Sequence, residues 1–162
     1  MVNNFNFNKN FKAQVDKFTV DTEEKFLIVI KDSIQDLVKE ATKSEEYGGK
    51  MHVDTGFLRS TGTGAINQIP RGPDQGRKRN PGETGVIYHS DPVGSIQGLL
   101  PKLKIGDTFY YGWTAHYASI REMYDNFLKS ASQKWSYFIR KNGRKFFKSG
   151  YKKWSQSVDK RI

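Results

Sequence analysis

The sequence predicts an α+β fold, in which a small antiparallel sheet carries a long N-terminal helix and a second helix packed on one face. Three observations lead to this prediction. Apolar residues recur every three or four positions in roughly the first forty residues and again after residue 123, which is helical spacing. Between these regions lie two strand-like runs bounded by Gly and Pro. A length of 162 residues suits a single domain, 1–162.

The first helical pattern extends from about residue 8 to residue 44. We expect a break near its middle, because Thr19, Asp21 or Thr22 can cap a new helix start. The predicted arrangement is a short helix or arm followed by a long helix from about Thr22 to Ser44. Tyr47-Gly48-Gly49 is expected to end it.

Asn and Phe alternate at the start of the chain, from Asn3 to Asn8. Such a stretch can add an edge strand to a sheet or hook onto a neighbouring subunit. First residues are also commonly disordered unless they are tied down. Residues 1–8 therefore form either an N-terminal arm or a frayed terminus.

A polar turn at residues 54–56 precedes the first predicted strand. Asp54 or Thr55 can cap a short helix by accepting backbone N–H bonds, and Gly56 relaxes the backbone at that point. A strand from about Ser60 to Ile69 is expected to follow.

Residues 70–84 are rich in Pro, Gly and basic side chains, which predicts a long exposed hairpin loop projecting from the sheet. A strand from Thr84 to Ser90 is expected after it, then an irregular connection from Asp91 to Lys104 and an aromatic strand from Ile105 to Trp113. The loop residues that we expect to contact DNA or a protein partner are Arg71, Arg77, Lys78 and Arg79.

The C-terminal third is predicted to be helical. One helix should run from about Met123 to Lys141 and stop at Asn142-Gly143, and residues 143–162 should form a basic, aromatic C-terminal helix or tail. The buried face of the first of these helices is expected to consist of Met123, Phe127, Leu128, Ala131, Trp135, Phe138 and Ile139.

The net charge of +10 is concentrated in the second half of the chain. Residues 1–69 carry a net charge of minus one, and residues 70–162 carry plus eleven. This asymmetry indicates a polyanion or an acidic protein nearby. Aromatic and cationic residues alternate near the C-terminus, as in some nucleic-acid-binding surfaces. Their helical spacing nevertheless favours a core or a subunit interface, with the lysines on a solvated face.

Candidate chemistry is sparse. There is no cysteine, and the three histidines are isolated in sequence, so we expect no metal site and no cofactor. Gly62-Thr63-Gly64 resembles a glycine-rich turn, but it lacks the frame of a phosphate-binding loop. Asp54, Glu122 and Asp125 are candidates for acid–base chemistry or Mg²⁺ binding. We favour a cap at Asp54 and an ion pair from Glu122 to Arg59 or Arg121, and we expect no enzymatic activity.

Two sequence patches carry a family resemblance. The first is Val53-Asp54-Thr55-Gly56-Phe57-Leu58-Arg59-Ser60, and the second comprises Tyr117, Ala118 and Glu122, followed by Phe127-Leu128-Lys129-Ser130-Ala131. Over residues 5–140 the chain resembles the neck and tail-completion proteins of tailed bacteriophages. Family members usually have a Gly soon after the Glu and a Pro before the Phe-Leu step. This chain has Met123-Tyr124-Asp125-Asn126 there, which favours an earlier start of the helix.

The resemblance implies a structural virion protein, in the host cytoplasm during assembly and in the virion afterwards. Its subunits would form a ring, with six-fold symmetry expected, that joins the DNA-filled head to the tail and contacts other neck and tail proteins, with double-stranded DNA in the channel. In that family context the expected structural-turn residues are Asp54, Thr55, Gly56, Arg59 and Glu122. The expected subunit interface pairs Phe26 and Ile30 of the first helix with Tyr110, Tyr111 and Trp113 of the aromatic strand.

The alternative function is nonspecific nucleic-acid binding through the basic C-terminal half. A membrane location is not expected under either function. The longest apolar run, Phe26 to Ile30, is too short to span a bilayer, and the N-terminus lacks the apolar core of a signal peptide.

Overall fold

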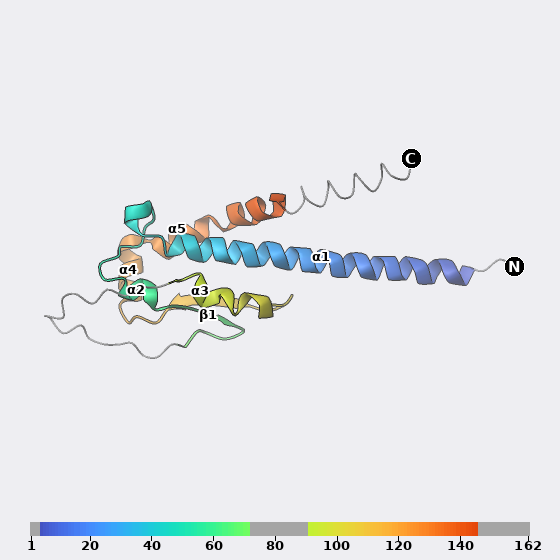
Figure 1. Cartoon of the computed structure of the whole chain (residues 1–162), viewed down its shortest axis with the longest axis horizontal. Coiled ribbons are helices and arrows are strands. Elements are labelled where there is room, and N and C mark those ends of the chain that lie inside the picture. The colour runs from blue at the N-terminus through green and yellow to red at the C-terminus, as the bar shows by residue number, and fades with distance from the viewer. Residues whose placement is uncertain (1–3, 72–90, 146–162) are drawn as a thin grey trace.

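The computed structural model describes residues 4–71 and 91–145 and confirms the predicted α+β class. Short helices and a two-stranded antiparallel sheet gather around one end of a long N-terminal helix (Figure 1). The elements are α1 Asn4–Ala41, η1 Glu45–Tyr47, α2 Phe57–Ser60, β1 Gly62–Ile66, α3 Gly94–Gln97, η2 Leu100–Lys102, β2 Phe109–Trp113, α4 Ala118–Asp125 and α5 Phe127–Gln133. Residues 135–145 form further helical turns.

Helix α1 is continuous over 38 residues, about 57 Å at 1.5 Å per residue. The predicted break is therefore wrong. The Thr19 and Thr22 hydroxyls donate to the carbonyls of Val15 (3.0 Å) and Phe18 (2.7 Å) instead of capping a new start. The strand interpretation of the N-terminus is also wrong over residues 4–8, which belong to α1. The first half of α1 projects beyond the rest of the described chain (Figure 1).

Helix α1 ends earlier than predicted, and a short 3-10 helix follows it. The helix ends at Ala41, and the predicted stop at Tyr47-Gly48-Gly49 instead closes η1. Gly48 adopts a φ of +78°, which a side chain would strain, and its N–H donates to the Glu45 carbonyl over 2.9 Å.

The two predicted strands that lie in the described chain are confirmed, with shorter bounds. β1 and β2 pair antiparallel, with Gly62 opposite Trp113 and Ile66 opposite Phe109. Gly62-Thr63-Gly64 is thus a strand and not a turn. A Cβ on Gly64 would lie only 2.9 Å from Phe109 Cζ, so a side chain at this position would force its neighbours to shift. The predicted strand Thr84 to Ser90 and most of the 70–84 loop lie outside the described residues.

A first apolar cluster joins α1 to the sheet. Ile34 and Val38 of α1 pack with side chains from the segment 94–103, and Ile66, Phe109, Tyr111 and Trp135 pack around them. The connection predicted to be irregular instead forms α3 and η2. It contributes the buried residues Ile96, Leu100 and Leu103.

The predicted helix from Met123 is in fact two helices. α4 starts earlier, at Ala118, and the chain turns at Asn126, whose φ of 53° and ψ of 34° place it in the left-handed region. Phe127, Ala131 and Phe138 are buried as predicted. Met123 is wrongly assigned to the buried face, because it is 81% exposed, and Leu128 is 38% exposed. Trp135 and Ile139 are half-buried.

Residues 135–145 lie beside α1 and run in the opposite direction (Figure 1). Asn142 is buried and donates from Nδ2 to Ser33 Oγ (3.2 Å) and to Asp36 Oδ2 (3.0 Å). Lys141 Nζ forms an ion pair with Asp36 Oδ2 at 3.0 Å. The predicted helix stop at Asn142-Gly143 is therefore wrong, because Asn142 forms a tertiary contact while the helical turns continue to residue 145. Most of the predicted 143–162 helix or tail lies outside the described residues.

A membrane-spanning helix would need a longer apolar stretch than any that the described ranges 4–71 and 91–145 contain.

Candidate assembly site

The two motif patches, more than fifty residues apart in sequence, meet in a second apolar cluster. Its buried members are Met51 and Leu58 from the first patch and its flank, and Ala115 and Phe127 from the second region. Val53, Phe57, Trp113, Tyr117 and Ala118 pack around this cluster. The motif residues therefore share one structural unit, in which each patch covers the other.

The predicted turn is present at residues 54–56, but the N-cap of α2 is Gly56 and not Asp54 or Thr55, so the predicted side-chain cap is wrong. Gly56 has a φ of +79°, and the Thr55 hydroxyl oxygen accepts a weak hydrogen bond of 3.4 Å from the Phe57 N–H. The short helix α2 then buries Leu58 and directs the Phe57 ring onto Tyr117, with ring centroids 6.1 Å apart. Arg59 is half-buried in the last turn.

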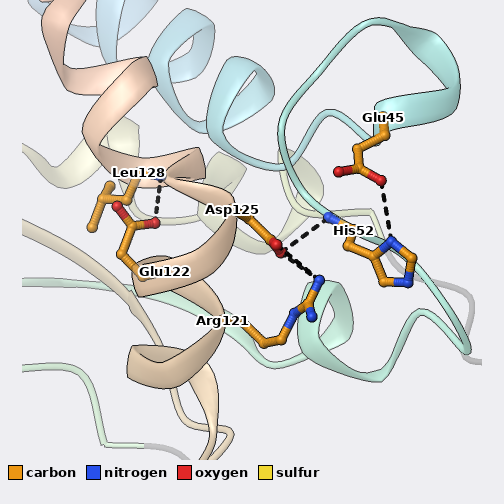
Figure 2. A network of polar contacts seen from close by, with 6 residues as sticks. All are labelled: Glu45, His52, Arg121, Glu122, Asp125 and Leu128. Carbon is orange, nitrogen blue, oxygen red and sulfur yellow. Dashed lines mark hydrogen bonds and ion pairs between the residues drawn. The ribbon is translucent and has the colours of Figure 1, made fainter.

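A polar network ties the loop after α1 to α4 (Figure 2). Arg121 Nη2 donates to both oxygens of Asp125, over 2.9 and 2.7 Å, and the backbone N–H of His52 donates to Asp125 Oδ2 over 3.3 Å. His52 Nδ1 also lies 3.1 Å from Glu45 Oε2. The Asp125 side chain is only 8% exposed. A buried charge is costly unless it is paired, and here Arg121 and the His52 N–H provide the partners.

Glu122 has a different role from the predicted ion pair. Its Oε2 accepts from the Leu128 N–H over 2.8 Å, and its Oε1 accepts from the Lys129 N–H over 2.9 Å. Figure 2 shows this carboxylate pointing at the start of α5, away from Arg121. Glu122 therefore caps α5, and Asp125 is the residue that pairs with Arg121.

The network is suited to holding elements together. Glu122 and Asp125 accept bonds from backbone N–H groups and an arginine, and His116 lies edge-on to Tyr117 with ring centroids 5.4 Å apart. No group of three His, Asp or Glu side chains within residues 4–71 and 91–145 has a geometry that could hold a metal ion. These groups fix the relative positions of the loop after α1, α4 and α5.

The five residues expected at a subunit interface divide into two sets. Phe26 and Tyr110 are 55% and 40% exposed and are open to a partner. Ile30, Tyr111 and Trp113 are half-buried and pack against the chain's own apolar clusters. Burial raises the pKa of Tyr111 to about 12, and Trp113 packs edge-on against Phe127, with ring centroids 4.9 Å apart. The face of β2 that carries Tyr111 and Trp113 therefore packs within the subunit.

Two exposed apolar surfaces extend beyond the predicted interface, of which only Phe26 was predicted to face a partner. The first, here called the α1 stripe, comprises Phe11, Val15, Phe18 and Phe26, whose spacing places them on one face of α1. The second, here called the α4 patch, comprises Ile120, Met123 and Tyr124, which are 54%, 81% and 77% exposed. The spacing of Ile120, Met123 and Tyr124 was the available signal, but such spacing does not tell a buried face from an exposed one.

Of the four basic residues expected to contact DNA or a protein partner, one lies within the described residues. Arg71, at the start of the predicted loop, is exposed, whereas Arg77, Lys78 and Arg79 lie outside the described residues. Two lysines of the second half are used internally, because Lys134 pairs with Glu40 and Lys141 pairs with Asp36.

Comparisons with models of protein families, with curated proteins and with solved structures found no match to this chain.

Proposed function

We propose that this protein is a neck or tail-completion subunit of a tailed bacteriophage, one of the copies in a ring that joins the DNA-filled head to the tail. The observation that carries the proposal is the meeting of the two motif patches in one cluster. The resemblance rests on residues 53–60 and on Tyr117, Ala118 and Glu122. In the fold, Leu58 and Phe127 share a core, Phe57 stacks on Tyr117 and Glu122 caps α5. Motifs that hold a subunit together fit a structural role.

The exposed apolar surface supports assembly. Phe11, Phe18 and Phe26 are each more than half exposed along a helix that projects from the subunit (Figure 1). Large contiguous apolar surfaces on a soluble chain mark interaction sites. A subunit that completes its burial against neighbouring copies accounts for this distribution.

The charge supports a location around DNA. The plus-eleven second half would line a channel or dock an acidic neck protein, with Arg71, Arg77, Lys78 and Arg79 as the contact residues. In a ring, each copy would contribute a weak contact to the phosphate backbone of DNA. Together these contacts would give strong binding.

In vitro complementation tests the proposal. Purified protein is added to separated heads and tails from a lysate that lacks it, and infectious particles are counted. Restored infectivity is the expected result. A protein that is correctly folded by circular dichroism but restores no particles at any concentration would contradict the proposed function.

A further inference from the structure

We infer that the α1 stripe of one copy docks on the α4 patch of the next copy, so that the subunits associate head to tail. This inference deepens the proposed function and rests on the association of copies that it assumes. It replaces the predicted pairing of the first helix with the aromatic strand, because Tyr111 and Trp113 of that strand pack inside the subunit.

A single chain cannot bring these two surfaces together. The α4 patch lies at the end of the molecule opposite the projecting half of α1 (Figure 1). Because α1 is one continuous helix from Asn4 to Ala41, its first half cannot fold back without breaking. The two surfaces of one copy cannot cover each other, so a contact between them requires a second copy.

The exposed areas of the two surfaces match. With ~200 Å² for a fully exposed large side chain, the three phenylalanines of the α1 stripe and the three residues of the α4 patch each expose roughly 400 Å². The α1 stripe is longer than the α4 patch, because Phe11 and Phe26 lie about 22 Å apart along the helix axis and Ile120 and Tyr124 about 6 Å. One contact would therefore bury the patch and the facing part of the stripe, roughly 600 Å² of apolar area, which approaches the apolar share of a small specific interface. Both surfaces are helix faces, and helix faces pack ridges into grooves.

Pairing of the α1 stripe with the same stripe of a second copy would account for only one of the two exposed surfaces. If α1 paired with α1 of a second copy, the α4 patch would stay uncovered, with Met123 81% exposed. A head-to-tail contact covers the α4 patch and part of the α1 stripe with one interface. Contacts between two different surfaces propagate from copy to copy, and they close into a ring when the rotation between copies allows it.

Cysteine cross-linking of the full chain tests the inference, because the chain has no cysteine of its own. Phe18→Cys and Met123→Cys are prepared separately, mixed and treated with a short bismaleimide. Val20→Cys is the matched control, since Val20 is 53% exposed but lies on the opposite face of the same stretch of α1. All three positions are exposed, so the fold should be retained, which circular dichroism checks.

The expected result is a product of two chain masses in the Phe18→Cys and Met123→Cys mixture. Neither variant alone, nor Val20→Cys mixed with Met123→Cys, should give that product. Phe18→Cys homodimers, or no product above the Val20→Cys control at any protein concentration, would overturn the interface. A head-to-tail product from a chain that never closes into a ring would retain this interface and remove the ring from the proposed function.

Discussion

Glu122 and Leu128 are joined by a hydrogen bond across the break between α4 and α5, with the Leu128 N–H donating to Glu122 Oε2 over 2.8 Å. The second carboxylate oxygen accepts from the next N–H, that of Lys129, over 2.9 Å. The first N–H groups of a helix have no partner within the helix, so one side chain satisfies two of them. Glu122 thereby fixes the start of α5, whose Phe127 belongs to the second apolar cluster.

Replacing Glu122 by Ala should lower the free energy of unfolding by about 1–2 kcal/mol, the usual cost of losing a helix cap. Glu122→Gln should cost about half as much, because its amide retains one acceptor oxygen. Denaturant titration followed by circular dichroism measures both. Glu46→Ala, at an exposed glutamate of η1, is the control and should change stability by less than about 0.5 kcal/mol. Equal effects at Glu122 and Glu46 would contradict the capping role.

The sheet offers a matched pair of glycines. A methyl group at Gly64 would lie 2.9 Å from Phe109 Cζ and 3.0 Å from Ile96 Cγ2, whereas at Gly112 it would meet nothing within 4 Å. Gly64→Ala should therefore destabilise the protein by about 1–3 kcal/mol through overpacking, and Gly112→Ala should be close to neutral. Thermal unfolding midpoints of the two variants make the comparison. A neutral Gly64→Ala would mean that α3 does not pack on β1 as described.

Stability should depend on pH through Asp36 and Lys141. Burial acts to raise the pKa of Asp36, but the hydrogen bond from Asn142 and the ion pair with Lys141 outweigh it, so the pKa lies below its usual 3.8. Stability from this carboxylate is present above about pH 4 and is lost as the pH falls through the lowered value. The bond to Asp36 raises the pKa of Lys141 above 10.5, so its contribution is lost only in strongly alkaline solution.

Asp36→Asn should flatten the acid side of the stability profile relative to the wild type. The hydrogen bond from Asn67 also lowers the pKa of Asp107, so some acid dependence should remain in the variant. Unfolding free energies between about pH 2 and pH 7 give the comparison. Parallel profiles for the two proteins would show that Asp36 is not coupled to folding.

The isolated chain should bind duplex DNA weakly at physiological salt, because the proposed contacts gain strength only when a ring multiplies them. Replacing Arg71, Arg77, Lys78 and Arg79 by Ala should reduce the salt dependence of binding, by about 0.9 in the logarithmic slope for each phosphate that is no longer neutralised. Fluorescence anisotropy at several salt concentrations gives this slope. Submicromolar, steeply salt-dependent binding by the isolated chain would favour the alternative function of nonspecific nucleic-acid binding. An unchanged slope in the variant would remove the loop as the anion site.

Local patterns predicted much of the fold. The spacing of apolar residues located α1, and the Asp-Thr-Gly turn located α2. The predicted core residues Phe127, Ala131 and Phe138 are buried. These features depend on neighbours within a few residues, which the sequence displays directly.

The errors involve choices that only tertiary contacts decide. Threonine hydroxyls can cap a helix or bond back to the preceding turn, and Thr19 and Thr22 do the latter. Pro and Gly made the segment 91–104 look irregular, yet Ile96, Leu100 and Leu103 stabilise its helical turns by packing on α1. Glu122 reaches across six residues to Leu128, a distance at which an ion pair within α4 looked more plausible.

The sequence indicated the residues of the candidate site but not the contact between its two patches. Each motif patch could be recognised, but their meeting depends on a fold that brings α2 against α4 and α5. The exposure of Met123 was not predictable, because apolar residues at helical spacing indicate a face and not what covers it.

Electron microscopy of a lysate in which only the gene for this protein is deleted tests the central claim most directly. Joined and unjoined particles are counted, with the complemented deletion as the control. The proposal that the protein forms the joint predicts heads that are separate from finished tails, or heads that have lost their DNA. Joined virions at wild-type frequency would contradict the claim and remove the protein from the neck.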